Sequence, residues 1–99
     1  MTEIIVDVTR NHYHVKAEGH AGDPLICAGI SVLTQMMGAC IINHDECKVK
    51  KFTIEDGLVD LDWISPDWKV LEDTKAMTLG LLQLEHTYPE ALKIKQNIL

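Results

Sequence analysis

Residues 19–31 read Gly-His-Ala-Gly-Asp-Pro-Leu-Ile-Cys-Ala-Gly-Ile-Ser, and this short run converts an extended segment into a helix. Asp23 and Pro24 are a strong helix-start signal, because Asp caps free N–H groups and Pro fits the first helical position. His20 precedes the turn, and Cys27 follows it as the fourth helical residue. A helix start and a neighbouring imidazolium both favour the thiolate over the thiol, so this spacing is typical of an activated cysteine.

Two strands are expected before the turn. Residues 2–9 and 12–18 each alternate apolar and polar side chains, which predicts two half-buried strands. Arg10-Asn11 between them suits a two-residue hairpin turn, because Asn tolerates positive φ. The inward positions are Ile4, Val6, Val8, Tyr13, Val15 and Ala17. Continued alternation places His20 on the outward, solvated side.

The helix after the turn is expected to run from Pro24 to about Asn43. Its apolar stripe has helical spacing and consists of Ile26, Ile30, Leu33, Met37 and Ile41. A neighbouring stripe is small or polar: Cys27, Ser31, Thr34 and Gly38. That second stripe has two interpretations, close packing against another helix or subunit, or a cleft lined by Cys27 and Ser31.

The second half of the chain repeats this plan. Residues 48–54 and 58–64 form a predicted hairpin around Asp56-Gly57, with a bulge near Lys50-Lys51. Ser65-Pro66 is expected to open a second helix, which Tyr88-Pro89 ends. Gly80 inside that helix indicates a close contact. Leu92 begins a last edge strand. The expected fold is α+β with the order ββαββαβ, a mainly antiparallel sheet and two packed helices.

Length and charge narrow the function. The 99 residues predict one domain, residues 1–99, and the net charge of -6 argues against a direct nucleic-acid partner. The first residues lack a secretory signal, and no apolar stretch reaches the ~20 residues of a membrane helix. We therefore expect a cytoplasmic protein without a membrane partner, whose cysteines, Cys27, Cys40 and Cys47, are reduced.

Metal binding is not expected. Cys40, His44 and Cys47 supply only three ligands, and Cys40 is interpreted as a small buried apolar residue. His12 and His14 share a strand face without an evident third ligand. The remaining carboxylate pair, Asp60 and Asp62, is interpreted as an exposed polar strand face rather than as an acid–base pair.

The sequence resembles a known family, the ribosomal-processing cysteine proteases called Prp. The resemblance rests on Gly19-His20-Ala21 and on Cys27-Ala28-Gly29-Ile30-Ser31, supported by the Asp-Gly hairpin, the long second helix and Tyr88-Pro89-Glu90. It implies a small, dimeric, cofactor-free thiol protease of bacteria or phages. The family acts in ribosome biogenesis, clipping an N-terminal extension from a precursor of ribosomal large-subunit protein twenty-seven, beside a hydrophobic and aromatic stretch. In this resemblance His20 is the catalytic histidine, Cys27 the nucleophile, and Ser31 the serine one turn later.

One segment departs from the family pattern. Only six residues separate His20 from Cys27, whereas family members have a longer segment there, and Pro24 stands where they carry an Asp. The longer segment is expected to form a mobile wall of the active site. The alternatives are therefore a shortened phage or prophage relative acting on a capsid protein, or a non-catalytic dimeric binding module with the same fold.

The chemistry also follows from the residues. The Cys27 thiolate would attack a peptide carbonyl, and His20, brought within hydrogen-bonding reach, would protonate the departing amine. The N–H groups of Cys27 and Ala28 are the backbone oxyanion candidates, provided that the helix does not already use them. Ser31 either supports the thiolate or bonds back to a helix carbonyl. Asp23 either orients His20 or caps the helix.

Overall fold

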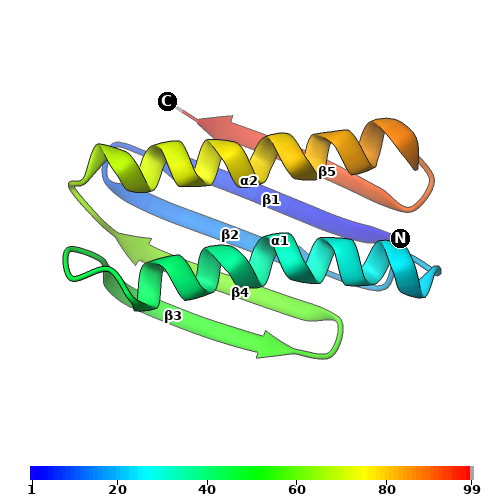
Figure 1. Cartoon of the computed structure of the whole chain (residues 1–99), viewed down its shortest axis with the longest axis horizontal. Helices are drawn as coiled ribbons and strands as arrows, with labels where there is room; N and C mark the ends of the chain where they lie inside the picture. Colours follow the sequence, from blue (N-terminus) through cyan, green and yellow to red (C-terminus); the bar gives the residue numbers. More distant parts are fainter. Residues whose placement is uncertain (99) are drawn as a thin grey trace.

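The computed structural model describes residues 1–98, so Leu99, the last residue of the expected domain, lies outside it. Five strands and two helices follow one another along the chain (Figure 1). They are β1 (Thr2–Thr9), β2 (His12–Glu18), α1 (Pro24–Ile42), β3 (Lys48–Glu55), β4 (Leu58–Ile64), α2 (Trp68–Thr87) and β5 (Leu92–Ile98). The predicted ββαββαβ order and α+β class are confirmed.

The strands form one sheet in the order β3-β4-β2-β1-β5. Three pairs are antiparallel, and the edge strand β5 runs parallel to β1. The predicted bulge is present as a register shift between Val49 and Lys51. Both helices lie on the same face of the sheet (Figure 1), so one face is buried and the other is open, as alternating strands require.

The core fills the space between the helices and the covered face of the sheet. Every predicted inward residue of β1 and β2 is buried there. The rings of Tyr13 and Trp63 stack with centroids 5.0 Å apart. Apolar residues from all seven elements except β3 complete the core, including Ile30, Met37, Val59, Leu61, Val70, Met77, Leu81 and Leu92.

The two helices approach each other closely at Gly80, which has no side chain. A Cβ on Gly80 would lie 3.0 Å from Leu33 Cδ2, which confirms the expected close contact. Leu33 is consequently only half-buried, and Thr34 replaces it in the core. The Thr34 hydroxyl donates to the Ile30 carbonyl at 2.9 Å, so its burial leaves no unpaired donor.

The start of α2 differs from the prediction. Asp67, not Ser65, is the N-cap, and its side chain accepts from the Lys69 N–H. Ser65 Oγ instead accepts the Asp67 N–H at 3.2 Å. Two capping residues stand two positions apart in the sequence, and the one nearer the helix takes the role. The predicted end is confirmed, because Tyr88 is the C-cap.

The open face of the sheet carries an ionic network. Asp60 Oδ1 lies 2.8 Å from His14 Nε2, and Asp60 Oδ2 lies 2.9 Å from Lys51 Nζ. These neighbours cover Asp60, which is only 5% exposed, so the expectation of an exposed side chain was wrong for this residue. Burial acts to raise the pKa of Asp60, but the hydrogen bonds and charges of Lys51 and His14 outweigh it, and the pKa is lowered.

Helix α1 is more apolar than expected. An 18-residue window in it has a mean hydropathy of 2.0, so its length and composition would suffice to cross a membrane, and the expectation that no stretch reaches this limit was too strict. The core helix of a soluble protein can meet the same length and hydropathy criterion. In this structure Ile26, Ile30, Met37 and Ile41 pack against the sheet.

Candidate active site

The turn between β2 and α1 is anchored to both neighbouring segments. Gly19 donates its N–H to the Gly57 carbonyl at 2.9 Å, and the Thr2 hydroxyl donates to the Gly19 carbonyl at 3.3 Å. Gly19 has φ +101°, and a Cβ there would lie 2.6 Å from the Met1 carbonyl oxygen. Only glycine fits this position without moving the backbone, so the sequence holds the turn close to the β3–β4 hairpin.

The helix start is built as the sequence predicts. Asp23 is the N-cap, and its Oδ1 accepts the Leu25 N–H at 2.8 Å. The Cys27 N–H donates to the Asp23 carbonyl at 3.0 Å. Cys27 therefore lies in the first turn of α1, close to the positive end of the helix dipole, which favours a thiolate.

A backbone donor of the turn contacts the thiol directly. The Ala21 N–H points to Cys27 Sγ, with 3.2 Å between nitrogen and sulphur. A hydrogen bond of this kind stabilises the thiolate more than the neutral thiol, because the acceptor then carries a full charge. The six-residue segment thus folds back onto the nucleophile through its main chain.

His20 and Cys27 line the same small hollow, together with Ser31 and Gly57. Its volume is about 90 Å³, and His20 itself is exposed, as the alternation predicts. The His20 ring rests on the β3–β4 turn, since a Cβ on Gly57 would lie 2.8 Å from Nε2. Within residues 1–98 no hydrogen bond joins the His20 ring to Cys27 Sγ, so the expected direct contact is not made in this state of the protein.

The structure supports some of the other predicted residue roles and not others. Asp23 caps the helix and makes no hydrogen bond to His20 among the described residues, which favours capping as its function. The Cys27 N–H is already bonded, and Ala28, the fifth residue of α1, has its N–H in the regular helical pattern. Ser31 lines the hollow, so the cleft interpretation of its stripe holds, while its support of the thiolate stays a prediction.

The other two cysteines lie in a different environment. Burial and the charge of Asp73 raise the pKa of the Cys40 thiol, although the residue is exposed, which corrects its interpretation as a buried residue. Burial is also the largest cause of the raised pKa of Cys47. Near neutral pH both thiols are therefore poor nucleophiles.

His44 joins neither thiol in a ligand set. Its Nε2 lies 2.9 Å from Asp67 Oδ2. In the part of the chain that the structure describes, no three His, Cys, Asp or Glu side chains are grouped to hold a metal ion.

A thiol at a helix start, stabilised by a main-chain N–H and sharing a hollow with a histidine, is an arrangement that cysteine-dependent hydrolases use. Comparison with known families specifies the class. Residues 1–93 match the family described as Cysteine protease Prp, and the chain belongs to this family. It is a cysteine protease. A search of the curated proteins found no match.

Solved structures share the fold. The chain is similar to the essential ribosomal processing protease Prp from Staphylococcus aureus in complex with a covalently linked product peptide, with a TM-score of 0.81, 20% identity, and coverage of 98% of this chain and 100% of that one. The same protease with a substrate peptide gives 0.75 at 18% identity, covering 98% and 100%. A protein from Streptococcus mutans gives 0.73 at 22% identity, covering 100% and 96%.

Two features of the site were not predicted. Gly57 was recognised only as a turn residue, yet it is also the surface on which His20 rests. Ala21 supplies the main-chain donor to the sulphur. The direction of a main-chain N–H cannot be predicted from the type of residue. The glycines on both sides of His20-Ala21 were the available signal, because Gly19 and Gly22 both adopt positive φ.

Proposed function

We propose that this protein is an endopeptidase whose nucleophile is Cys27 and whose general acid is His20. The hydrogen bond from the Ala21 N–H to Cys27 Sγ carries the proposal, because it selects this thiol among the three. The helix start acts in the same direction. The raised pKa values of Cys40 and Cys47 support the same choice.

The reaction follows from this arrangement. The thiolate attacks the peptide carbonyl carbon, a C–S bond forms, and the charge moves from sulphur to oxygen. The Ala21 N–H, already beside the sulphur, is a main-chain donor for that oxyanion. The C–N bond then breaks as His20 protonates the amine. His20 then deprotonates a water, which attacks the thioester carbonyl; the C–S bond breaks, and the Cys27 thiolate and the protonated His20 are restored.

His20 must move for this step. Its ring is exposed and rests on Gly57, so a rotation of an exposed side chain brings it to the leaving amine. Catalytic hydrogen bonds are often absent before substrate binds and form in the complex. We propose that the substrate, by filling the hollow, places the ring.

We propose a ribosomal substrate, the precursor of ribosomal large-subunit protein twenty-seven, cut at its N-terminal extension. The family and the ribosomal processing protease of Staphylococcus aureus support this choice. The net charge of -6 suits a basic ribosomal protein, because opposite charge accelerates encounter. A capsid protein is the second substrate to test, since the segment from His20 to Cys27 is short.

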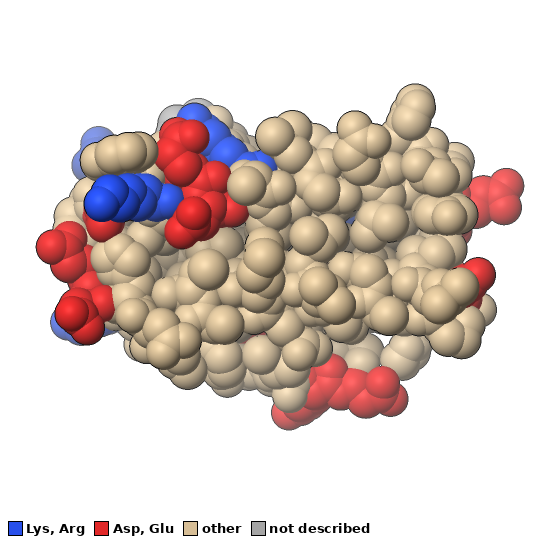
Figure 2. Space-filling model, in the orientation of Figure 1, with Lys and Arg blue, Asp and Glu red and all other residues tan. Residues whose placement is uncertain are grey.

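We also propose that the protein is cytoplasmic and forms a homodimer through its helices. The helical face is largely free of charged residues over α1 and the second half of α2, whereas acidic and basic side chains cluster over the start of α2 (Figure 2). Large apolar side chains are exposed on both helices: Leu25, Val32, Met36, Trp68 and Leu79. Exposed apolar patches of this kind mark interaction surfaces.

The function is tested by incubating the protein with the ribosomal precursor and with capsid proteins, and by locating cuts by mass spectrometry. We expect one cut in the ribosomal extension by the wild type and by Cys40→Ala, and none by Cys27→Ala. A capsid cut alone would replace the proposed substrate. Cleavage that survives in Cys27→Ala, or no cleavage of any candidate by the wild type, would refute the proposal.

A further inference from the structure

The two edges of the sheet are protected to different degrees. At the β5 edge, Glu85 of α2 reaches the strand, and its Oε2 accepts the Ile94 N–H at 2.8 Å. At the β3 edge, residues 48–51 carry three lysines and the bulge. Lysines and bulges are means by which proteins keep an edge strand from pairing. Residues 52–55, the second half of β3, carry neither of these protections.

This unprotected half of β3 has unused main-chain groups. Glu55 and Leu58 close the two-residue turn of the hairpin, so they form a hydrogen-bonded pair. Hydrogen-bonded and non-hydrogen-bonded pairs alternate along an antiparallel ladder. Ile54 and Phe52 therefore direct their N–H and C=O groups away from β4. Among the residues that the structure describes, no main-chain hydrogen bond outside the ladder involves either of them.

The same two residues are held in place by α1. A Cβ on Gly38 would lie 3.3 Å from Phe52 Cε2 and 3.6 Å from Ile54 Cδ1, so both side chains pack against the helix at Gly38. The main chain of this edge is consequently ordered before a partner arrives, which lowers the entropic cost of pairing. No other element of the described chain lies beyond β3 (Figure 1). The edge is therefore both ordered and accessible.

The free edge leads to the nucleophile. Strand β3 runs in the direction opposite to α1, so its end lies near the start of the helix (Figure 1). Glu55 and Gly57, which follow Ile54 in the chain, line the hollow that holds Cys27. Strand residues advance about 3.3 Å each, so Phe52 is about 10 Å from Glu55. A peptide paired with this edge therefore reaches the hollow within a few residues.

We propose that the substrate adds to the sheet as a further strand, paired with the N–H and C=O groups of Phe52 and Ile54. This inference rests on the proposed function, because the paired segment is the part of the substrate that is cut at Cys27. The hollow of about 90 Å³ corresponds to roughly three water molecules at about 30 Å³ each. It admits an extended peptide group and no folded element. Main-chain pairing supplies affinity without depending on substrate side chains.

The first experiment removes single N–H groups from the substrate. Synthetic peptides that span the cut in the ribosomal extension, each with one N-methylated residue, are bound to the inactive Cys27→Ala protein and measured by calorimetry. Successive N–H groups of an extended strand point to opposite sides, so only every second one can pair with β3. We expect N-methylation at alternate positions on one side of the cut to weaken binding about tenfold, and at the positions between them less than about threefold.

The second experiment removes one donor from the protein. Ile54→Pro deletes an N–H that points away from β4, and proline is tolerated on an edge strand at such a position. Ile54→Ala is the matched control, because it loses the same side chain and keeps the N–H. In the Cys27→Ala background we expect the Pro variant to bind the unmodified peptide about tenfold more weakly than the Ala variant. Circular dichroism verifies that both variants are folded.

The outcomes separate this inference from the proposed function. Alternating losses in Cys27→Ala, together with no cleavage by the wild type, would refute the proposed function and leave the pairing in place. Equal losses at all positions, no loss at any, no binding of the peptide, or equal affinities of the two Ile54 variants would overturn the pairing. A change of oligomeric state in Ile54→Pro without a change in peptide affinity would assign the edge to a second copy instead. If Ile54→Pro does not fold, the methylated peptides decide.

Discussion

Gly57→Ala should show how strongly turnover depends on the position of the His20 ring, apart from any loss of fold stability. The substituted Cβ would lie 2.8 Å from His20 Nε2, and ordinary van der Waals contact begins at 3.4 Å, so the ring must shift by about 0.6 Å. Gly57 also has φ +73°, a conformation that costs other residues about 1–2 kcal/mol. For a domain of this size that cost lowers the Tm by roughly 5–15 °C.

The expected kinetic effect is larger than the loss of stability explains. The Gly57 surface limits where the ring can lie as it turns toward the leaving amine, and a misplacement of about 1 Å there can reduce turnover about a hundredfold, so we expect kcat to fall at least tenfold. Cleavage of a peptide spanning the cut should be followed well below the Tm of the variant. Circular dichroism at the same temperature verifies that the variant is folded.

Val8→Ala provides the matched control. Val8 is 1% exposed and lies at the far end of β1, beside the turn to β2. Its truncation costs about 2 kcal/mol by lost burial and cavity formation and touches no residue of the site. Val8→Ala should melt at a similarly lowered temperature and keep its kcat. Full activity of Gly57→Ala, or an equal loss in Val8→Ala, would refute the role given to Gly57.

Two further predictions follow from hydrogen bonds in the structure. Asp60→Asn should lower the free energy of unfolding by about 1–2 kcal/mol at pH 7. The difference from wild type should vanish as the pH falls through the lowered pKa of Asp60, which lies below its unfolded value of about 4. Urea titrations at pH 7 and pH 2.5 measure this difference, and an undiminished difference at pH 2.5 would contradict the prediction. Asp23→Ala should lower the free energy of unfolding by about 1 kcal/mol, because the hydrogen bond that caps the Leu25 N–H is lost. Asp23→Ser should retain both stability and turnover. Loss of turnover in the Ser variant would show that Asp23 does more than cap the helix.

Most of the fold could be predicted because its signals are local. Alternation in β1 and β2, the Asp-Gly turn and the helix start at Asp23-Pro24 each depend on a few adjacent residues. The prediction for Asp60 was wrong because its environment depends on residues that are distant in the sequence. Asp60 is buried because Lys51 and His14 from neighbouring strands cover it.

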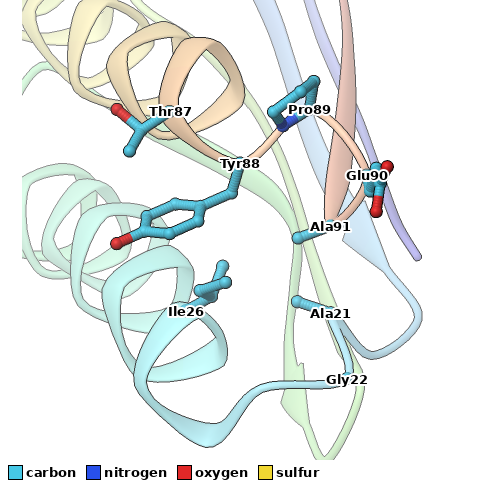
Figure 3. Close-up of a pocket in the computed structure, with 8 residues that line it drawn as sticks. All are labelled: Ala21, Gly22, Ile26, Thr87, Tyr88, Pro89, Glu90 and Ala91. Atoms are coloured by element: carbon cyan, nitrogen blue, oxygen red, sulfur yellow. The ribbon is translucent and has the colours of Figure 1, made fainter.

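The candidate site was predictable in its residue types and not in its contacts. The spacing of His20 and Cys27 indicated the pair, and the structure places both in one hollow. Which group contacts the sulphur depends on backbone angles in the turn, where the Ala21 N–H takes the place expected for the imidazole. The hollow lined by Ala21, Ile26 and Tyr88 brings together segments more than 60 residues apart (Figure 3), and no local sequence pattern predicts that these segments lie side by side.

The most direct test of the central claim, that Cys27 is the activated thiol, is the rate at which each cysteine is alkylated. The wild type is treated with iodoacetamide at pH 6.5, and modification of Cys27, Cys40 and Cys47 is followed over time by peptide mass spectrometry. The thiolate is the reacting form, and burial raises the pKa of both Cys40 and Cys47. We predict that Cys27 reacts faster than either, because the Ala21 N–H contacts its sulphur. Alkylation of Cys27 at the same rate as the exposed Cys40, or more slowly, would contradict the account.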